Sequence, residues 1–261
     1  MINYEDEYQA YNSNEILEIT VLSLKGNRIL QEDCVGYVLK RKEGIVVLCD
    51  GMGGHDGGQM ASRTAVEGFL QAYNTYDESV SVQEFLLATL DGLDRTIHGL
   101  KRSDGNLMQA GTTITAIYIQ DNRLFWVSAG DSRLYAIRNR EMVQITKDHT
   151  YRMLLDLRKS KGEISQEEYK TEIKRGQMLI SFLGVGGLPY VENNKAPFML
   201  QGDDLLVLMS DGIYKLLEPK EMEELFQSGR VTEMVSGIQA KVAASAQKNI
   251  DNLTIAIVKI K

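Results

Sequence analysis

Three aspartates of this 261-residue chain stand at the ends of apolar runs, and each is followed directly by glycine or asparagine. Asp50 follows one such run, Asp211 follows a second, and Asp251 comes just before a third. A carboxylate at the mouth of a buried strand is costly in free energy unless a positive charge meets it. Several such carboxylates brought together would form a site of oxygen ligands suited to a hard divalent cation. The pattern therefore points to metal-assisted chemistry.

Further polar residues accompany these aspartates along the chain. Arg28 belongs to a type that grips a phosphate through two hydrogen bonds, and the nearby Glu32 and Asp33 could accept hydrogen bonds from metal-bound water. Gly51 follows Asp50, and a glycine lets the backbone carbonyl approach a ligand closely. Taken one at a time, these stretches are more simply read as tight turns and solvated loops.

The elements that must position these residues are antiparallel strands and pairs of helices. Apolar periodicity and turn residues predict strands at 16–24, 35–39, 45–49, 112–119, 123–128, 134–137, 142–145, 204–210 and 253–260, and helices at 57–73, 81–100, 219–227 and 232–246. Regular alternation of strand and helix is absent, which disfavours a doubly wound parallel sheet. We therefore expect an α+β fold in layers. The charged, helix-prone segment at about 150–178 is expected to run over the surface as a flap.

Composition sets the broad class of the protein. A hydrophobic content of 43% is enough for a sizeable core, and no linker rich in Pro, Gly or Ser divides the chain. We expect a flexible N-terminal extension at 1–15 and one domain at 16–261. The net charge of −7 argues against a nucleic-acid-binding protein, which would more often be basic.

The cysteines and the N-terminus indicate where the chain works. Cys34 and Cys49 lie beside apolar residues without a CxxC spacing, so they are expected to be reduced core thiols rather than zinc ligands. The N-terminal residues are acidic and polar, unlike a signal peptide, and no apolar run approaches the ~20 residues that span a bilayer. We expect a soluble, cytoplasmic protein that does not engage a membrane.

Taken together and in order, the motifs of this chain resemble the metal-dependent (type 2C, PPM) protein serine/threonine phosphatases. The motifs that carry the resemblance are Arg28, Glu32–Asp33, Asp50–His55, Gly111–Thr113, Gly130–Arg133, Asp148–His149, Ser210–Gly212 and Asp251–Asn252. They cover roughly residues 16–260, and Met52 followed by His55 looks like the bacterial branch of the family.

The resemblance implies a fold and a metal centre. The fold would be an α-β-β-α sandwich of two packed antiparallel sheets flanked by helix pairs. A pair of Mn²⁺ or Mg²⁺ ions would lie at the sheet ends. Asp50 would bridge both ions, Gly51 would offer its carbonyl, and Asp211 and Asp251 would each bind one ion.

The resemblance also implies the reaction and its partners. A hydroxide held by both ions would attack phosphoserine or phosphothreonine in line, while Arg28 and the ions neutralise the phosphoryl oxygens. Glu32 and Asp33 would hold metal-bound waters. Phosphorylated proteins would be the substrates, together with a partner Ser/Thr kinase whose signalling the phosphatase opposes.

The chain departs from the family pattern at three positions. Family members often carry a histidine, assigned as general acid, where Met52 stands. His55 is a candidate for that role only because it lies close to Met52 in the sequence. Lys215 occupies the place of an aspartate that supports a third ion together with the residue at Asp131. We therefore predict that a third metal site is weak or absent and that Lys215 pairs with Asp131 or Asp211. Phe182 stands where the family often has a basic residue.

Two other functions fit parts of the pattern. The first is a catalytically weak pseudo-phosphatase that binds phosphoproteins as a regulator, which the residues Phe182 and Lys215 favour and the three aspartates oppose. The second is a metal phosphoesterase for nucleotides or nucleic acid, which the acidic composition and the motif order disfavour.

Overall fold

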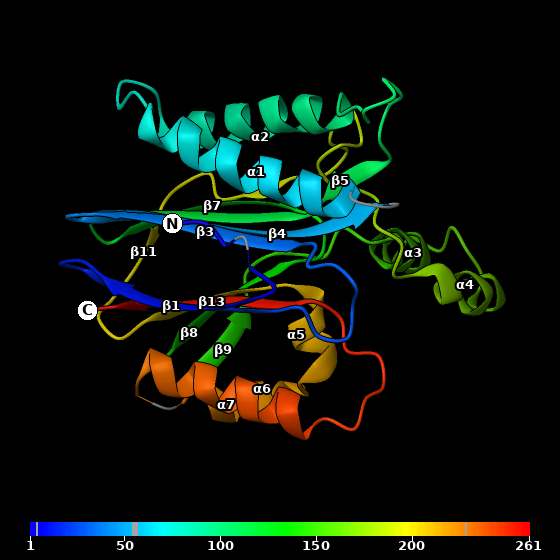
Figure 1. The fold of residues 1–261 in the computed structure, drawn as a ribbon. Coiled ribbons are helices and arrows are strands. Elements are labelled where there is room, and N and C mark those ends of the chain that lie inside the picture. The colour runs from blue at the N-terminus through cyan, green and yellow to red at the C-terminus, as the bar shows by residue number, and fades with distance from the viewer. Residues whose placement is uncertain (4, 54–56, 228) are drawn as a thin grey trace.

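Two antiparallel sheets pack face to face, and helices cover the outer side of each (Figure 1). The computed structural model describes residues 1–3, 5–53, 57–227 and 229–261. The first sheet has the strand order β10-β7-β6-β4-β3, with β5 paired to β4 and β11 to β7. The second has the order β1-β2-β13-β12-β8-β9. The α-β-β-α sandwich expected from the sequence is confirmed.

The first sheet and its helices come mainly from the N-terminal half of the chain. Its strands are β3 (Asp33–Lys40), β4 (Glu43–Gly53), β5 (Ala110–Thr112), β6 (Ile114–Gln120), β7 (Arg123–Ala129), β10 (Glu192–Asn193) and β11 (Phe198–Met199). The helices α1 (Gly57–Asn74) and α2 (Val82–His98) cover it. Both helices are amphipathic, and α2 begins at Ser81, whose hydroxyl accepts the Glu84 N–H at 3.2 Å.

The second sheet combines the N-terminal strands with the C-terminal half of the chain. Its strands are β1 (Glu7–Ser13), β2 (Leu17–Leu24), β8 (Arg133–Arg138), β9 (Glu141–Gln144), β12 (Leu205–Met209) and β13 (Leu253–Ile260), and its helices are α5 (Asp211–Leu216), α6 (Pro219–Leu225) and α7 (Val231–Ala244). Between the two sheets lies a buried apolar cluster that includes Ile19, Leu48, Ile117, Leu208 and Val258. This shared core fixes the sheets against each other, so strand ends from both can meet at one edge.

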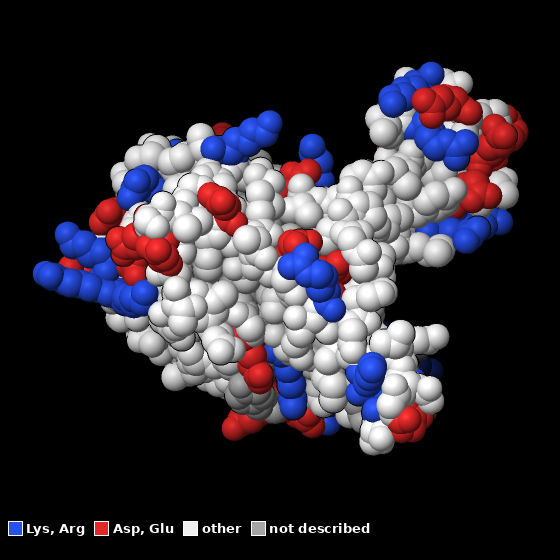
Figure 2. Space-filling model, turned by 90° about the horizontal axis from the view of Figure 1, so that it is seen from above, with Lys and Arg blue, Asp and Glu red and all other residues white. Residues whose placement is uncertain are grey.

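The segment between β9 and β10 stands apart from the sandwich. It contains α3 (Tyr151–Ser160), α4 (Gln166–Glu172) and a 3₁₀ turn (Ile173–Arg175). Leu155 is the one fully buried residue of α3, and α4 has none. In Figure 2 the segment forms a lobe at the upper right that carries basic and acidic side chains side by side. A helix pair that is polar on nearly all sides depends on local capping, which Ser165 and Glu168 supply at α4.

The N-terminal residues differ from the prediction. A flexible extension was expected at 1–15, yet β1 pairs with β2 over its whole length, from Glu7 opposite Leu24 to Ser13 opposite Glu18. The polar composition that suggested an unfolded segment is instead typical of an edge strand, which is stabilised by main-chain hydrogen bonds and exposes polar side chains. Helix α5 also lacked a sequence signal, because its six residues are too few to show a helical period.

None of the helices in the described ranges combines the length and the apolar character that crossing a bilayer requires.

Candidate metal centre

The centre starts from two adjacent strands of the first sheet. Asp33 opens β3, Asp50 lies near the end of β4, and the two residues face each other directly in the antiparallel ladder. Side chains of directly opposed residues point to the same face of a sheet. The pairing therefore brings together two carboxylates that are far apart in the sequence.

The second sheet supplies the remaining aspartates at the ends of β12 and β13. Asp211 begins α5 two residues after the end of β12, and Asp251 lies two residues before β13. Ser210 ties the two sheets together here, because its hydroxyl donates to Asp33 Oδ2 at 2.8 Å and accepts the Thr254 N–H at 3.0 Å. The strand ends of both sheets thus converge, as expected from the sequence.

Backbone contacts hold Asp50 and Gly51 in place. The Asp50 N–H donates to Thr113 Oγ1 at 3.0 Å, and the Asp50 carbonyl accepts both the Thr113 N–H and the Thr112 hydroxyl at 2.8 and 2.9 Å. Gly51 is buried, and a Cβ at this position would lie 2.2 Å from the Gly58 carbonyl oxygen. Only glycine fits this close approach between the end of β4 and the start of α1.

Burial and mutual repulsion disfavour ionisation of the carboxylates. Burial raises the pKa of Asp33 to about 7 against the opposing Ser210 hydrogen bond, and the charges of Asp211 and Asp251 add to the rise. Burial and then the neighbouring aspartates, led by Asp33, raise the pKa of Asp50 well above its ordinary value. Such shifts indicate an excess of negative charge that a bound cation would relieve.

Among the described residues, two buried carboxylate oxygens at the centre have no hydrogen-bond partner. They are Asp33 Oδ1 and Glu32 Oε1, and a buried acceptor without a partner is costly in free energy. Glu32 is otherwise held through its backbone, since its N–H donates to Asn252 Oδ1 at 2.9 Å and its carbonyl accepts the Gly51 N–H at 3.1 Å. Unpaired oxygens next to clustered carboxylates fit a hydrated divalent cation, because the waters it carries would donate to them.

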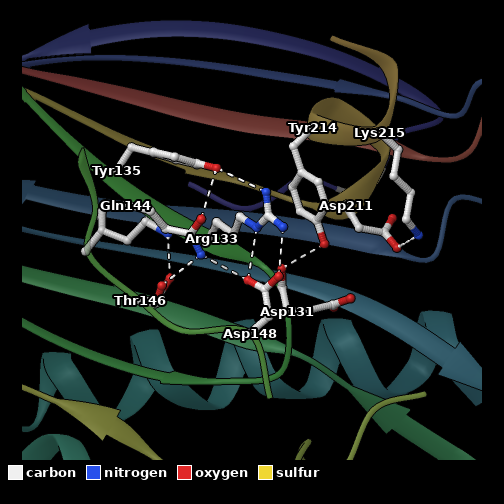
Figure 3. A network of polar contacts seen from close by, with 10 residues as sticks. Asp131, Arg133, Tyr135, Gln144, Thr146, Asp148, Asp211, Tyr214 and Lys215 are labelled. Atoms are coloured by element: carbon white, nitrogen blue, oxygen red, sulfur yellow. Dashed lines mark hydrogen bonds and ion pairs between the residues drawn. The ribbon is translucent and has the colours of Figure 1, made fainter. Parts of the chain in front are cut away.

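Two of the aspartates are paired with cations of the chain itself. Arg28 Nη2 lies 2.7 Å from Asp251 Oδ2, and the Lys215 ammonium contacts Asp211 Oδ2 (Figure 3). The contact of Lys215 with Asp211 is one of the two that the sequence predicted. Within the described ranges, no three Asp, Glu, His or Cys side chains are grouped closely enough to hold an ion as they stand. Asp251 and Asp211 face Arg28 and Lys215 instead of the other two aspartates.

A polar network fixes Asp131 beside this centre (Figure 3). Arg133 makes two hydrogen bonds with Asp148, at 3.0 and 2.7 Å, and its guanidinium lies 3.5 Å from the centre of the Tyr214 ring. The Tyr214 hydroxyl donates to the Asp131 carbonyl at 3.1 Å. Burial, then the charges of Asp211 and Asp148, raise the pKa of Asp131 to about 6, whereas Lys215 opposes the rise. The network therefore links the Asp131 turn to α5, which carries Asp211.

Two histidines, His55 and His149, also belong to the sequence motifs. His55 falls outside the described residues. His149 is buried, and its Nδ1 accepts the Gly130 N–H at 3.1 Å, so it packs and caps a turn. Ser210 and Thr113 belong to the sequence motifs, but their contacts with Asp33 and Asp50 were not predicted, and Tyr214 was missed, because a bracing hydroxyl leaves no spacing signal in a sequence.

Comparison with known proteins identifies the family. A family model described as protein phosphatase 2C matches residues 24–250, which is most of the chain. The chain belongs to the protein phosphatase 2C family. The resemblance inferred from the motifs is thereby confirmed.

Curated relatives and solved structures agree with this membership. A serine/threonine phosphatase (stp) of Listeria innocua is 31% identical, over 84% of this chain and 86% of the relative. The protein phosphatase PhpP of Streptococcus pneumoniae is 28% identical, over 94% and 98%. The catalytic domain of the phosphatase PstP, solved with two manganese ions, is 26% identical with a TM-score of 0.70, over 94% of this chain and 98% of that one. A serine/threonine phosphatase of S. agalactiae, 23% identical with a TM-score of 0.78 over 94% and 100%, supports the fold.

Proposed function

We propose that this member of the protein phosphatase 2C family is a protein serine/threonine phosphatase that depends on Mn²⁺ or Mg²⁺. Family membership and relatives named as serine/threonine phosphatases support the activity. The PstP structure with two manganese ions supports the metal requirement. The observation that carries the proposal is the pairing of Asp33 with Asp50 where the two sheets meet, beside enclosed oxygens that have no hydrogen-bond partner in the part of the chain that the structure describes.

Four residues would hold the metal ions. Asp50, Asp211 and Asp251 would hold the ions through carboxylate oxygens once Lys215 and Arg28 release their aspartates, and Gly51 would contribute its neutral carbonyl oxygen. All four donors are oxygens, the type that Mn²⁺ and Mg²⁺ prefer. Such ions, when bound, activate water as a nucleophile and neutralise charge on a transferring phosphoryl group.

The remaining residues would bind substrate and order water. Arg28 has 57% of its side chain exposed beside Asp251, so it can turn its fork of N–H donors towards phosphate oxygens. Asp33 Oδ2 is engaged by Ser210, which leaves Oδ1 free to accept a hydrogen bond from water, and Glu32 Oε1 offers a second acceptor. With Lys215 on Asp211, a third ion that would also need Asp131 is weak or absent.

The substrates and setting follow from the proposed activity. Phosphoserine and phosphothreonine of cytoplasmic proteins are the substrates, and they include a partner Ser/Thr kinase and its targets. One catalytic domain carries the reaction, and the edge strand β1 is part of its second sheet. By resemblance to the family, the α3–α4 lobe would act as a flap that shapes the choice of substrate.

A metal add-back assay tests the proposal. Protein stripped with a chelator is supplied with Mn²⁺ or Mg²⁺, and phosphate release is followed from p-nitrophenyl phosphate and from a phosphothreonine peptide. We expect activity with either substrate only in the presence of metal, and a loss of ~1,000-fold or more in Asp50→Asn, since a metal ion supplies several kcal/mol of charge stabilisation. Asp203→Asn is the matched control, because Asp203 is an exposed aspartate that pairs with Lys259.

Three results would contradict the proposal. No turnover with any metal points to a regulator without catalysis. Activity that survives Asp50→Asn refutes the metal centre. Cleavage of dinucleotides but not of phosphopeptides reassigns the substrate class.

A further inference from the structure

An uncharged pocket adjoins the proposed metal centre at the end of β4. It has a volume of about 360 Å³, and its lining includes Met52, Leu107, Met108 and Phe182. No Asp, Glu, Lys or Arg is among the described residues that line it, whereas the neighbouring centre is dominated by carboxylates. At this volume it lies near the lower end of the range for small-molecule sites, which suits a single side chain better than a cofactor.

The pocket is continuous with the centre through the backbone. Met52 directly follows Gly51, and it pairs in the ladder with Gly111 of β5. The next residue of β5, Thr112, donates its hydroxyl to the Asp50 carbonyl at 2.9 Å and exchanges two backbone hydrogen bonds with Leu183, at 3.0 and 2.9 Å. One strand therefore contacts Asp50 at its C-terminal end and lines the pocket before it.

The walls of the pocket are held in place by buried contacts. The Asp94 carboxylate, which is 1% exposed, accepts the N–H groups of Gly184 and Gly187 at 2.7 and 2.6 Å. His98 Nδ1 lies 3.0 Å from the Gly184 carbonyl oxygen, which ties α2 to the same loop. The Phe182 ring packs on Gly111, where a Cβ would lie 2.8 Å from it. A wall anchored in this way is formed before any ligand arrives, which lowers the entropic cost of binding.

The rim offers exposed apolar surface to a partner. Leu107 is 60% exposed, although large apolar side chains gain free energy by leaving water. Methionines such as Met52 and Met108 adapt their shape to different apolar groups. The pocket thus has a firm wall formed by Phe182 and an adaptable lip formed by the methionines and Leu107.

We propose that this pocket receives an apolar side chain of the phosphoprotein substrate, close in sequence to the phosphorylated residue. The inference rests on the proposed function, because it takes the phosphoryl group to lie at the carboxylate centre. Met52 and Gly53 follow Asp50 by two and three residues on a strand, so the pocket begins about 7–10 Å from Asp50 at ~3.3 Å per residue. An extended peptide covers that distance in two or three residues.

A peptide series tests the pocket directly. In a phosphothreonine peptide of otherwise polar residues, leucine is placed singly at each position within about three residues of the phosphothreonine. Both kcat/KM with Mn²⁺ and the affinity, from fluorescence anisotropy of labelled peptides, are measured. We expect leucine at one position to improve both quantities about tenfold over serine, as burial of part of a leucine side chain predicts.

Two variants assign the preference to the pocket. Leu107→Asn adds a polar group to the exposed rim, and Phe182→Ser removes the wall. Each should reduce the preference for leucine to about twofold or less while hydrolysis of p-nitrophenyl phosphate stays unchanged, because that substrate has no flanking residue. Val143→Asn is the matched control, since Val143 is an apolar side chain of β9 that is 56% exposed. It should keep the full preference.

The outcomes separate this inference from the proposed function. Equal binding and turnover of all the peptides, or a preference that survives both variants, refutes the pocket while the phosphatase activity stands. Anisotropy does not depend on turnover. If no substrate is hydrolysed, a leucine preference in binding that Leu107→Asn abolishes would still support the pocket, and its absence would refute it.

Discussion

Replacing Lys215 with methionine removes the cation that now neutralises Asp211, one of the proposed metal ligands. The Lys215 ammonium contacts Asp211 Oδ2. Burial opposes the charge on this lysine, yet Asp211, followed by Asp131 and Asp50, raises its pKa above the ordinary value. An ion that binds Asp211 must therefore displace the lysine and overcome its repulsion. The variant keeps most of the volume of the side chain and deletes only the charge.

The size of the effect follows from the exposure of the pair. Half of the Lys215 side chain is exposed, against 17% of Asp211. Two unit charges ~4 Å apart attract by about 4 kcal/mol in a medium of effective dielectric constant near 20. Exposure and side-chain entropy reduce the net value of such a pair to about 0.5–1 kcal/mol, the upper part of the range for exposed pairs, because Asp211 is only 17% exposed. The variant should thus bind Mn²⁺ about two- to fivefold more tightly.

Isothermal titration of chelator-stripped protein with Mn²⁺ measures this change. The metal-free variant should also unfold more readily than the original protein, because the carboxylates lose a neighbouring cation, and Mn²⁺ should restore more stability to it. Lys241→Met is the matched control, since Lys241 pairs with Glu221 at a similar exposure on α7 and should leave Mn²⁺ affinity unchanged. Unchanged or weaker Mn²⁺ binding by the Lys215 variant would refute the competition.

Three further changes probe the elements around the centre. Ser210→Ala leaves Asp33 Oδ2 and the Thr254 N–H without this partner and should cost about 2 kcal/mol in urea unfolding, whereas Ser236→Ala, an exposed control, should cost far less. Burial lowers the pKa of His149 from 6.5 to about 4, so its contribution to stability is complete above pH 6.5 and is lost as the pH falls towards 4. That loss is at most about 3 kcal/mol, and His149→Asn should remove it; an unaltered pH dependence would contradict this role. Arg133→Lys should destabilise the protein more than Tyr214→Phe, because it loses the paired bonds to Asp148 as well as the stacking on Tyr214. Equal losses would contradict the network.

The fold was largely predictable because its signals are local. Alternating apolar residues and turn types predicted strands at 16–24 and 253–260, which the structure has at 17–24 and 253–260, and the helix predicted at 81–100 spans 82–98. Strand β1 was missed for a physical reason. An edge strand is stabilised by main-chain pairing with its neighbour, so its own side chains carry little pattern.

The motif order proposed Asp50, Asp211 and Asp251 as metal ligands, which stays a prediction, but it did not predict the contacts around them. The brace from Ser210 to Asp33 joins residues 177 positions apart and has no sequence signature. The pairing of Arg28 with Asp251 was equally hidden, because both residues were expected to face a ligand rather than each other.

The pocket beside the centre could not be predicted from the sequence, because its lining residues are far apart along the chain. Its lining comes from β4, His98 of α2, the loop at Leu107 and Met108, β5 and the loop at Phe182, and no single segment supplies more than three of these residues. Phe182 looked like a departure from the family pattern in the sequence. In the structure it packs on Gly111 and forms a wall of the pocket.

Crystals grown with Mn²⁺ and measured at the manganese absorption edge would show whether the three aspartates hold metal ions. Anomalous scattering would locate each ion without reference to the protein atoms. We expect two anomalous peaks between Asp50, Asp211 and Asp251, with Lys215 and Arg28 no longer in contact with their aspartates. Peaks elsewhere, or none while those carboxylates keep their present ion pairs, would contradict it.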